Sequence, residues 1–326
     1  MQNLYPIWGG AEKSADTLIK LLESRGHTVR WMCQTNQEEI QPQLNQIMED
    51  VDVVVTQLMW TPKATQLAEK YNKKSVVFIR SYENVCRIVF SDPKFHADCG
   101  QKCTGCKHKI TGYEPQGVAL RKADLIIANS RWMQLFLNER HQLHSEVVYP
   151  FIDFEDYNIE HTSRDYITMN QMSYAKGADI FLQIAKSMPT EKFKLVGNQG
   201  WMPPMDIPNN VKLEPFQSPQ EMYGDTWLWL NPARWEEPFG RTVIEAQIAQ
   251  VPVLTSTYST IVIDNKLHKT GGLKIKDLTN INEWKKAIKK IKKNPKRFTN
   301  KEAHTNLKPF SCEVNTEKFL QLMENL

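Results

Sequence analysis

The chain has 326 residues, of which 41% are hydrophobic and 24% charged, a globular composition that excludes disordered, collagen-like and small disulfide-stapled proteins. Its length predicts two domains, and its net charge of +4 permits an anionic partner without requiring one. No uncharged apolar run reaches the ~18–20 residues of a membrane span, and no basic-then-apolar leader follows Met1. We therefore expect a cytoplasmic protein.

Strands and amphipathic helices alternate through the first half of the chain. We expect strands at 1–6, 28–33, 51–55, 75–79 and 125–128, and helices at 12–24, 38–49, 61–71 and 113–121. The segment 1–6 has little apolar alternation, so the first strand is short or lacks residues upstream. Apolar strands separated by helices predict a parallel sheet covered on both faces.

The same pattern restarts after a polar segment at 151–164. We expect strands at 166–169, 193–196, 211–213, 227–230 and 251–255, and helices at 178–186 and 242–250. The sequence therefore predicts an α/β protein with two Rossmann-like, doubly wound domains that face each other across a cleft.

Two sites in this pattern suit an anionic ligand. Gly9-Gly10 opens a helix, where backbone amides can approach a phosphate, but a plain tight turn is the simpler explanation. Lys176, followed by Gly177, lies beyond the strand at 166–169 and could reach a phosphate in the cleft. Taken alone, one lysine among many is more readily explained as a solvated surface residue.

The segment 236–246 has the most specific pattern. Pro238 and Gly240 make a rigid turn with Glu237 in it, and Glu245 follows one turn inside the next helix. Such carboxylates can hold hydroxyls from two parts of one ligand while loop amides face a phosphate. The alternative is an acidic helix cap followed by an exposed helical glutamate.

Several segments occur in the order found in one known family. They are Gly9-Gly10-Ala11-Glu12, Gly26-His27-Thr28-Val29, the stretch 123–130, Lys176-Gly177, Glu237-Pro238-Phe239-Gly240 with Glu245-Ala246, and Val251-Pro252-Val253-Leu254. Over nearly its whole length the chain resembles the retaining GT-B glycosyltransferases of the group 1 family. The resemblance implies an acceptor-side domain at 1–150, a nucleotide-sugar domain at 151–309, and a terminal helix at 310–326 that packs back on the first domain.

The resemblance also implies a role for each site residue. Glu245 would bind the nucleotide ribose, Glu237 the donor-sugar hydroxyls, and Lys176 the diphosphate. The Phe239 and Gly240 amides would lie close by, and the Gly9-Gly10 turn would approach the diphosphate from the first domain. Lysine and amide groups would replace a divalent metal in catalysis. The sugar would reach a saccharide or lipid-linked saccharide acceptor with its anomeric configuration retained.

The chain departs from the family pattern at several positions. Gln171 occupies the place of an arginine five residues before the lysine, and Arg241 is our candidate replacement for that charge. Arg80-Ser81-Tyr82 occupies the place of a His-Asp pair, and Arg80 is the candidate replacement there. Gln250 stands in place of a glycine. These departures leave open a non-catalytic nucleotide-sugar-binding protein.

Four cysteines form a second candidate site within the loop 86–109. Cys86, Cys99, Cys103 and Cys106 have a spacing that suits a tetrahedral structural zinc in a reducing compartment, with His96 and His108 as spare ligands. We favour zinc over free thiols or a disulfide, and over an iron–sulfur cluster.

Eight basic residues gather in the segment 284–297. An ordinary solvated helix face is the simpler interpretation, and contact with nucleic acid or an anionic membrane is the sharper one. Together with the metal loop, this segment also leaves open a phage-type enzyme that glycosylates hydroxymethyl-pyrimidine bases in DNA.

Overall fold

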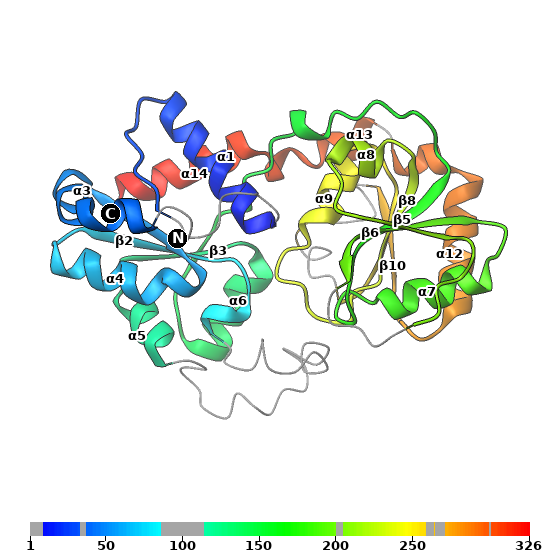
Figure 1. Cartoon of the computed structure of the whole chain (residues 1–326), viewed down its shortest axis with the longest axis horizontal. Coiled ribbons are helices and arrows are strands. Elements are labelled where there is room, and N and C mark those ends of the chain that lie inside the picture. The colour runs from blue at the N-terminus through cyan, green and yellow to red at the C-terminus, as the bar shows by residue number, and fades with distance from the viewer. Residues whose placement is uncertain are drawn as a thin grey trace. The chain divides into compact units, whose positions relative to one another are not determined.

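The computed structural model describes residues 9–32, 37–85, 114–199, 205–258, 264, 271–299 and 301–326. They divide into two compact units (Figure 1). The first contains the described residues up to 85, those from 114 to 153, and Phe310–Leu326. The second contains those between Phe154 and Pro309.

The first unit is built on a parallel sheet with the strand order β1-β2-β3-β4. Its strands are β1 (Val53–Gln57), β2 (Lys74–Ile79), β3 (Leu125–Ala128) and β4 (Glu146–Val147). Its α-helices are α1 (Gly10–Ser24), α2 (Gln37–Ile40), α3 (Leu44–Asp50), α4 (Thr61–Lys70), α5 (Glu114–Lys122), α6 (Arg131–His141) and α14 (Cys312–Glu324). Strand β2 is buried from Ser75 to Ile79, as expected for a strand covered on both faces.

The helix at the end of the chain completes the core of this unit. Figure 1 shows α1 and α14 on one side of the sheet and α4 and α5 on the other. The Phe319 ring of α14 stacks on Phe78 of β2 with centroids 5.7 Å apart, and Leu18 of α1 joins the same cluster. These apolar contacts anchor α14 to the first unit, although the second unit comes directly before it in the sequence.

The second unit is built on a six-stranded parallel sheet with the order β10-β9-β8-β5-β6-β7. Its strands are β5 (Tyr166–Met172), β6 (Lys192–Gln199), β7 (Val211–Glu214), β8 (Thr226–Asn231), β9 (Val253–Ser256) and β10 (Gly272–Ile275). Its α-helices include α7 (Ala178–Ser187), α8 (Pro219–Tyr223), α9 (Arg241–Ile248), α12 (Ile281–Lys293) and α13 (Lys301–Thr305). Leu228 and Leu230 of β8 face the core shared with α7 and α12, whereas Trp229 packs against Tyr223 of α8.

Both units confirm the predicted α/β class, but four expected elements differ. The helix predicted at 38–49 is broken into α2, a 3-10 turn at Gln41–Gln43 and α3, because Pro42 lacks an amide proton and disfavours helix before it. The described part of the predicted strand 28–33 forms no strand, and Thr28, Arg30 and Trp31 are exposed. Strands β5 and β6 each continue three residues past their expected ends, and β6 passes through Gly197 at φ +108°, a conformation that glycine tolerates.

The predicted strand at 1–6 lies outside the described residues. None of the helices in the described ranges combines the length and the apolar character needed to cross a bilayer.

Candidate functional site

The predicted site residue Lys176 lies in a turn that requires glycine. The turn 174–177 joins β5 to α7, and Gly177 adopts φ +78°. A side chain at Gly177 would also collide with the carbonyl oxygen of Pro232, just after β8. Gly177 therefore lets the lysine turn lie directly against the loop that carries Glu237.

Lys176 and Glu237 meet as an ion pair between the ammonium and one carboxylate oxygen. The other carboxylate oxygen accepts a hydrogen bond from the Asn231 amide at 3.2 Å. The lysine side chain is 17% exposed and that of the glutamate 8%, so both charges are largely withdrawn from water. Because β5 and β8 are parallel neighbours, their carboxyl ends meet at one sheet edge, which brings these residues together.

Arg234 holds the two loops together around this pair. Its backbone amide donates to the Ala175 carbonyl at 2.9 Å, and its guanidinium forms a bidentate ion pair with Asp179 in the first turn of α7. The guanidinium also lies over the Tyr174 ring, 4.5 Å from its centroid. Lys176 makes the same kind of cation–π contact, since its ammonium lies 5.6 Å from the centroid of the Trp235 ring. The lysine turn is thus fixed from both sides.

Glu245, the second predicted carboxylate, is paired with Arg241 one helical turn earlier in α9. The Tyr157 hydroxyl interacts with both side chains, and burial together with the Glu245 charge holds the pKa of Tyr157 well above its usual value. Burial alone would favour a neutral Arg241, but the neighbouring Glu245 raises its pKa, so the guanidinium stays charged. Arg241 therefore fixes the Glu245 carboxylate.

The predicted turn at Pro238–Gly240 leads directly into α9. Gly240 is the helix N-cap residue and adopts φ +80°, while the Phe239 side chain is only 4% exposed. The helix N-terminus that follows presents a partial positive charge suited to an anion. The proposed proximity of these two amides to a phosphate remains a prediction.

Other predicted positions lie elsewhere. Gly9 and Gly10 begin α1 in the first unit, where Gly9 is the N-cap residue, and their approach to a diphosphate remains a prediction. Arg80, also in the first unit, is buried: it donates to Gln57 Oε1 at 2.8 Å and lies over the Phe78 ring. Gln171 is exposed at a bulge in β5 and adopts φ +64°.

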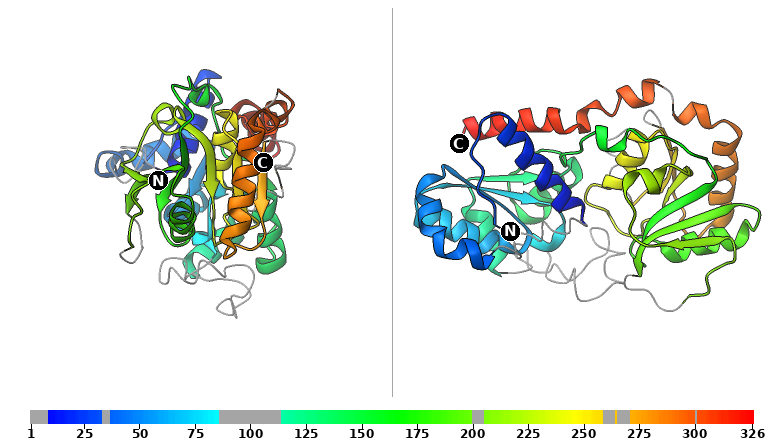
Figure 2. Two further views of the ribbon diagram at one scale, coloured as in Figure 1. Left: turned by 90° about the vertical axis from the view of Figure 1, so that its right-hand side faces the viewer. Right: turned by 45° about the horizontal axis from the view of Figure 1, so that its top comes forward.

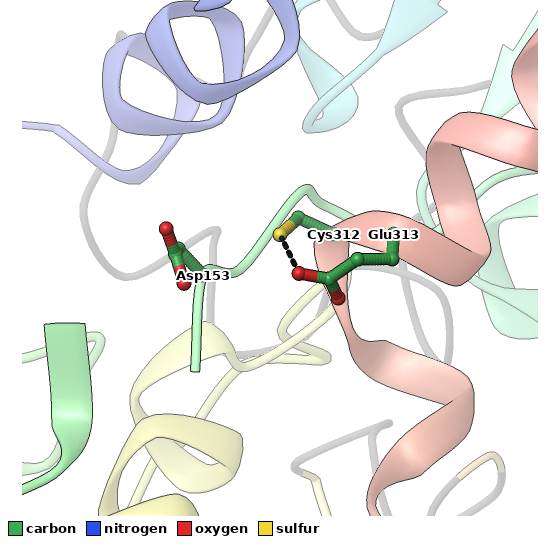
Figure 3. Close-up of side chains that lie close together, drawn as sticks. All are labelled: Asp153, Cys312 and Glu313. Atoms are coloured by element: carbon green, nitrogen blue, oxygen red, sulfur yellow. Dashed lines mark hydrogen bonds between the residues drawn. The ribbon is translucent and has the colours of Figure 1, made fainter. Parts of the chain in front are cut away.

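The predicted zinc ligands lie outside the described residues, namely Cys86, Cys99, Cys103 and Cys106 with the spare ligands His96 and His108. A different group, Asp153, Cys312 and Glu313, brings three potential ligand atoms within 4.8 Å of one another (Figure 3). Burial and the adjacent Glu313 raise the pKa of Cys312 to about 12. The thiol therefore stays protonated and donates to Glu313 Oε1 at 3.2 Å, which is a structural hydrogen bond and supplies no thiolate.

Residues 151–306 match the family model described as glycosyl transferases group 1. The second unit belongs to this family. The matched segment is about half of the chain and contains every residue of the Lys176–Glu237 and Arg241–Glu245 pairs. The group 1 assignment therefore covers the whole carboxylate motif and the lysine turn.

Solved structures of other proteins match the fold of this chain over both units. HepE of Anabaena, solved with UDP-glucose, shares 17% identity at a TM-score of 0.70, and the match covers 100% of this chain and 98% of HepE. Sucrose-phosphate synthase of Thermosynechococcus elongatus shares 15% identity at a TM-score of 0.68, over 92% and 81% of the two chains. Both matches confirm the GT-B prediction.

A curated relative covers less of the chain. An uncharacterised 42.6 kDa protein from the cps region of Klebsiella pneumoniae is 30% identical over 92 residues, or 27% of this chain. The match spans 25% of that relative's length.

The sequence did not reveal the residues that support the site, Arg234, Asn231 and Tyr157. Arg234 and Asn231 follow the strand expected at 227–230, so their place at the sheet edge could have been anticipated. Nothing in the sequence brings Tyr157 to Glu245, because 88 positions separate them and the contact depends on the tertiary fold.

Proposed function

We propose that this chain is a retaining glycosyltransferase that moves a sugar from a nucleoside diphosphate sugar to a saccharide or lipid-linked saccharide. The observation that carries the proposal is the ion pair of Lys176 with Glu237 in the group 1 unit, together with the Glu245 carboxylate that Arg241 fixes in α9, the helix that follows the Glu237 turn. A cation and two carboxylates are the groups needed for a diphosphate and two sets of hydroxyls.

In this proposal the Lys176 ammonium changes partner when the donor binds. It would leave Glu237 and stabilise the negative charge that develops on the departing diphosphate. Glu237, released from the lysine, would accept hydrogen bonds from donor-sugar hydroxyls while Asn231 keeps its orientation. Glu245 would accept from the ribose hydroxyls, held in place by Arg241.

Arg241 is assigned a positioning role here, because its guanidinium is engaged by Glu245. Gln171 stands where the family has an arginine that would pair with the phosphate. In this arrangement Arg241 does not replace that positive charge. Lys176 and the amides at the start of α9 would carry the stabilisation that a divalent metal gives other enzymes, so added metal should not be required. Retention of configuration would follow from attack on the face that the diphosphate leaves.

HepE structures contain UDP, glucose and UDP-glucose, which makes UDP-glucose the first donor to test. Nucleoside diphosphate sugars should be screened for thermal stabilisation and then for sugar release without an acceptor. A donor at about 100 times its dissociation constant adds about 2.7 kcal/mol of stability. Stabilisation without any turnover would favour a binding protein, and no stabilisation by any donor would refute the proposal.

We also propose that the four clustered cysteines hold one structural zinc in a reducing, cytoplasmic setting, a proposal that rests on their spacing. Elemental analysis of protein purified without metal-affinity resin tests it. Cys103→Ser should lose the zinc and keep donor binding, whereas four freely reactive thiols in the metal-free native protein would contradict it.

A further inference from the structure

The outer face of α12 carries a row of lysines that the glycosyltransferase chemistry does not use. Trp284, Ala287, Ile288 and Ile291 form the buried face of this helix. We call the exposed row on the opposite face the lysine stripe: Lys286, Lys289, Lys290 and Lys293. At 3.6 residues per turn these four share one side of the helix, directly opposite the buried face. Figure 2 shows α12 on the surface of the second unit.

Positive charge is concentrated in this part of the chain. The segment 284–297 contains eight basic residues and no acidic residue. The full chain has 41 basic and 37 acidic residues, so the remainder has 33 basic against 37 acidic. The positive net charge of the protein therefore comes from this segment, which is a local feature and not a general property of the surface.

The fold does not neutralise the lysine stripe. Within the described ranges, no acidic side chain lies within ion-pair distance of any of its four lysines, whereas neighbouring Lys292 pairs with Glu191 at 2.6 Å. Like charges spaced three and four residues apart on a helix repel one another and destabilise it. The stripe therefore opposes helix formation, which the buried face and the Asn280 cap must offset.

The helix dipole explains only part of this arrangement. Lysines in the last turn of a helix interact favourably with its C-terminus, which accounts for Lys290 and Lys293. Lys286 and Lys289 lie in the middle of α12, before its last turn, where the helix dipole does not stabilise a cation. The dipole therefore does not account for the full row of four lysines.

We propose that the lysine stripe docks the second unit onto an anionic lipid bilayer. From Lys286 to Lys293 the stripe is a straight row about 10 Å long on one side of the helix, suited to a flat charged surface. Single-stranded nucleic acid is less well matched, because the one aromatic residue of α12, Trp284, is fully buried and cannot stack on bases. No large apolar side chain of α12 is exposed, so the contact is electrostatic and reversible.

Sedimentation with vesicles tests the proposal on the full chain. Phosphatidylcholine vesicles containing about one third phosphatidylglycerol should bind the protein, pure phosphatidylcholine vesicles should not, and added salt should release it. Replacing three stripe lysines together, as Lys286→Gln, Lys289→Gln and Lys293→Gln, should weaken binding on the order of 100-fold.

A matched variant controls for the loss of net charge. Lys70, Lys308 and Lys318 are exposed and lie on other elements, so their replacement by glutamine removes the same charge. This control should bind anionic vesicles like the unaltered chain, and both variants should keep the donor stabilisation of the unaltered chain. Equal loss in both variants, or no binding of the unaltered chain to anionic vesicles, would overturn the proposal. So would duplex DNA binding that is tighter than vesicle binding at the same salt and is lost in the stripe variant.

Discussion

Removing the Lys176 ammonium should destabilise the second unit, because Glu237 would be left as a nearly buried carboxylate without its cation. Breaking a buried ion pair from one side costs about 3–5 kcal/mol. Here the lysine is 17% exposed, and Asn231 still donates to the remaining carboxylate oxygen. We therefore expect Lys176→Ala to lower the free energy of unfolding by about 2–3 kcal/mol.

A second change in the same pair separates this effect from lost packing. Adding Glu237→Gln to Lys176→Ala removes the uncompensated charge and should restore about 1–2 kcal/mol. The control is Lys122→Ala, which breaks an ion pair with Glu69 whose side chains are 53% and 60% exposed and should cost less than about 0.5 kcal/mol.

Urea unfolding followed by tryptophan fluorescence measures these differences, since Trp229 and Trp235 both lie in the second unit. Nucleoside diphosphate affinity should fall in Lys176→Ala and be retained in Glu237→Gln, because the latter keeps the ammonium. If Lys176→Ala were as stable as Lys122→Ala, or the double variant no more stable than Lys176→Ala, the ion pair would not hold the loops as described.

Three further changes test other features of the two units. Gly177→Ala should cost more than about 2 kcal/mol because of its positive φ and a collision with a carbonyl oxygen, whereas Gly26→Ala, at φ +87° with open space around it, should cost about 1 kcal/mol by thermal or urea unfolding. Arg234→Met should raise the donor KM and lower stability by about 2–3 kcal/mol, with partial recovery in Arg234→Lys; an unchanged KM would contradict the role of Arg234 in holding the lysine turn in place for the donor. The raised pKa of Cys312 contributes stability that is complete below about pH 9 and is lost as the pH rises through about 12. The difference in free energy of unfolding between the unaltered chain and Cys312→Ser should therefore shrink across that window when unfolding is measured at each pH. A difference that stays constant with pH would contradict this expectation.

The sequence predicted elements whose periodicity is strong. The helix expected at 178–186 is α7, Ala178–Ser187, and the apolar run of β2 is buried as a central strand should be. The ends of helices and strands were less predictable where a proline or a glycine with positive φ lies within them. Pro42 divides an expected helix, and Gly197 continues a strand because glycine tolerates its positive φ.

The candidate site was predictable in part, for a physical reason. Parallel neighbouring strands must end at one sheet edge, so Lys176 and Glu237 could be expected near each other. Their ion pair could not be predicted, since it depends on how closely Gly177 lets two loops approach. Similarly, the spacing of Arg241 and Glu245 permits an ion pair, but the interaction of both side chains with Tyr157 depends on the tertiary fold.

The central claim is that the second unit binds a nucleoside diphosphate sugar through Glu245 and Lys176. Isothermal titration of UDP-glucose and other nucleotide sugars into the full chain tests it most directly, with Glu245→Gln as the comparison because it keeps a hydrogen-bond acceptor beside Arg241. We predict measurable binding of at least one donor by the unaltered chain and a loss of about 10–100-fold in Glu245→Gln, as expected for weakened hydrogen bonds to a charged group. Equal donor affinity in the two proteins, or no binding by the folded unaltered chain, would contradict the claim.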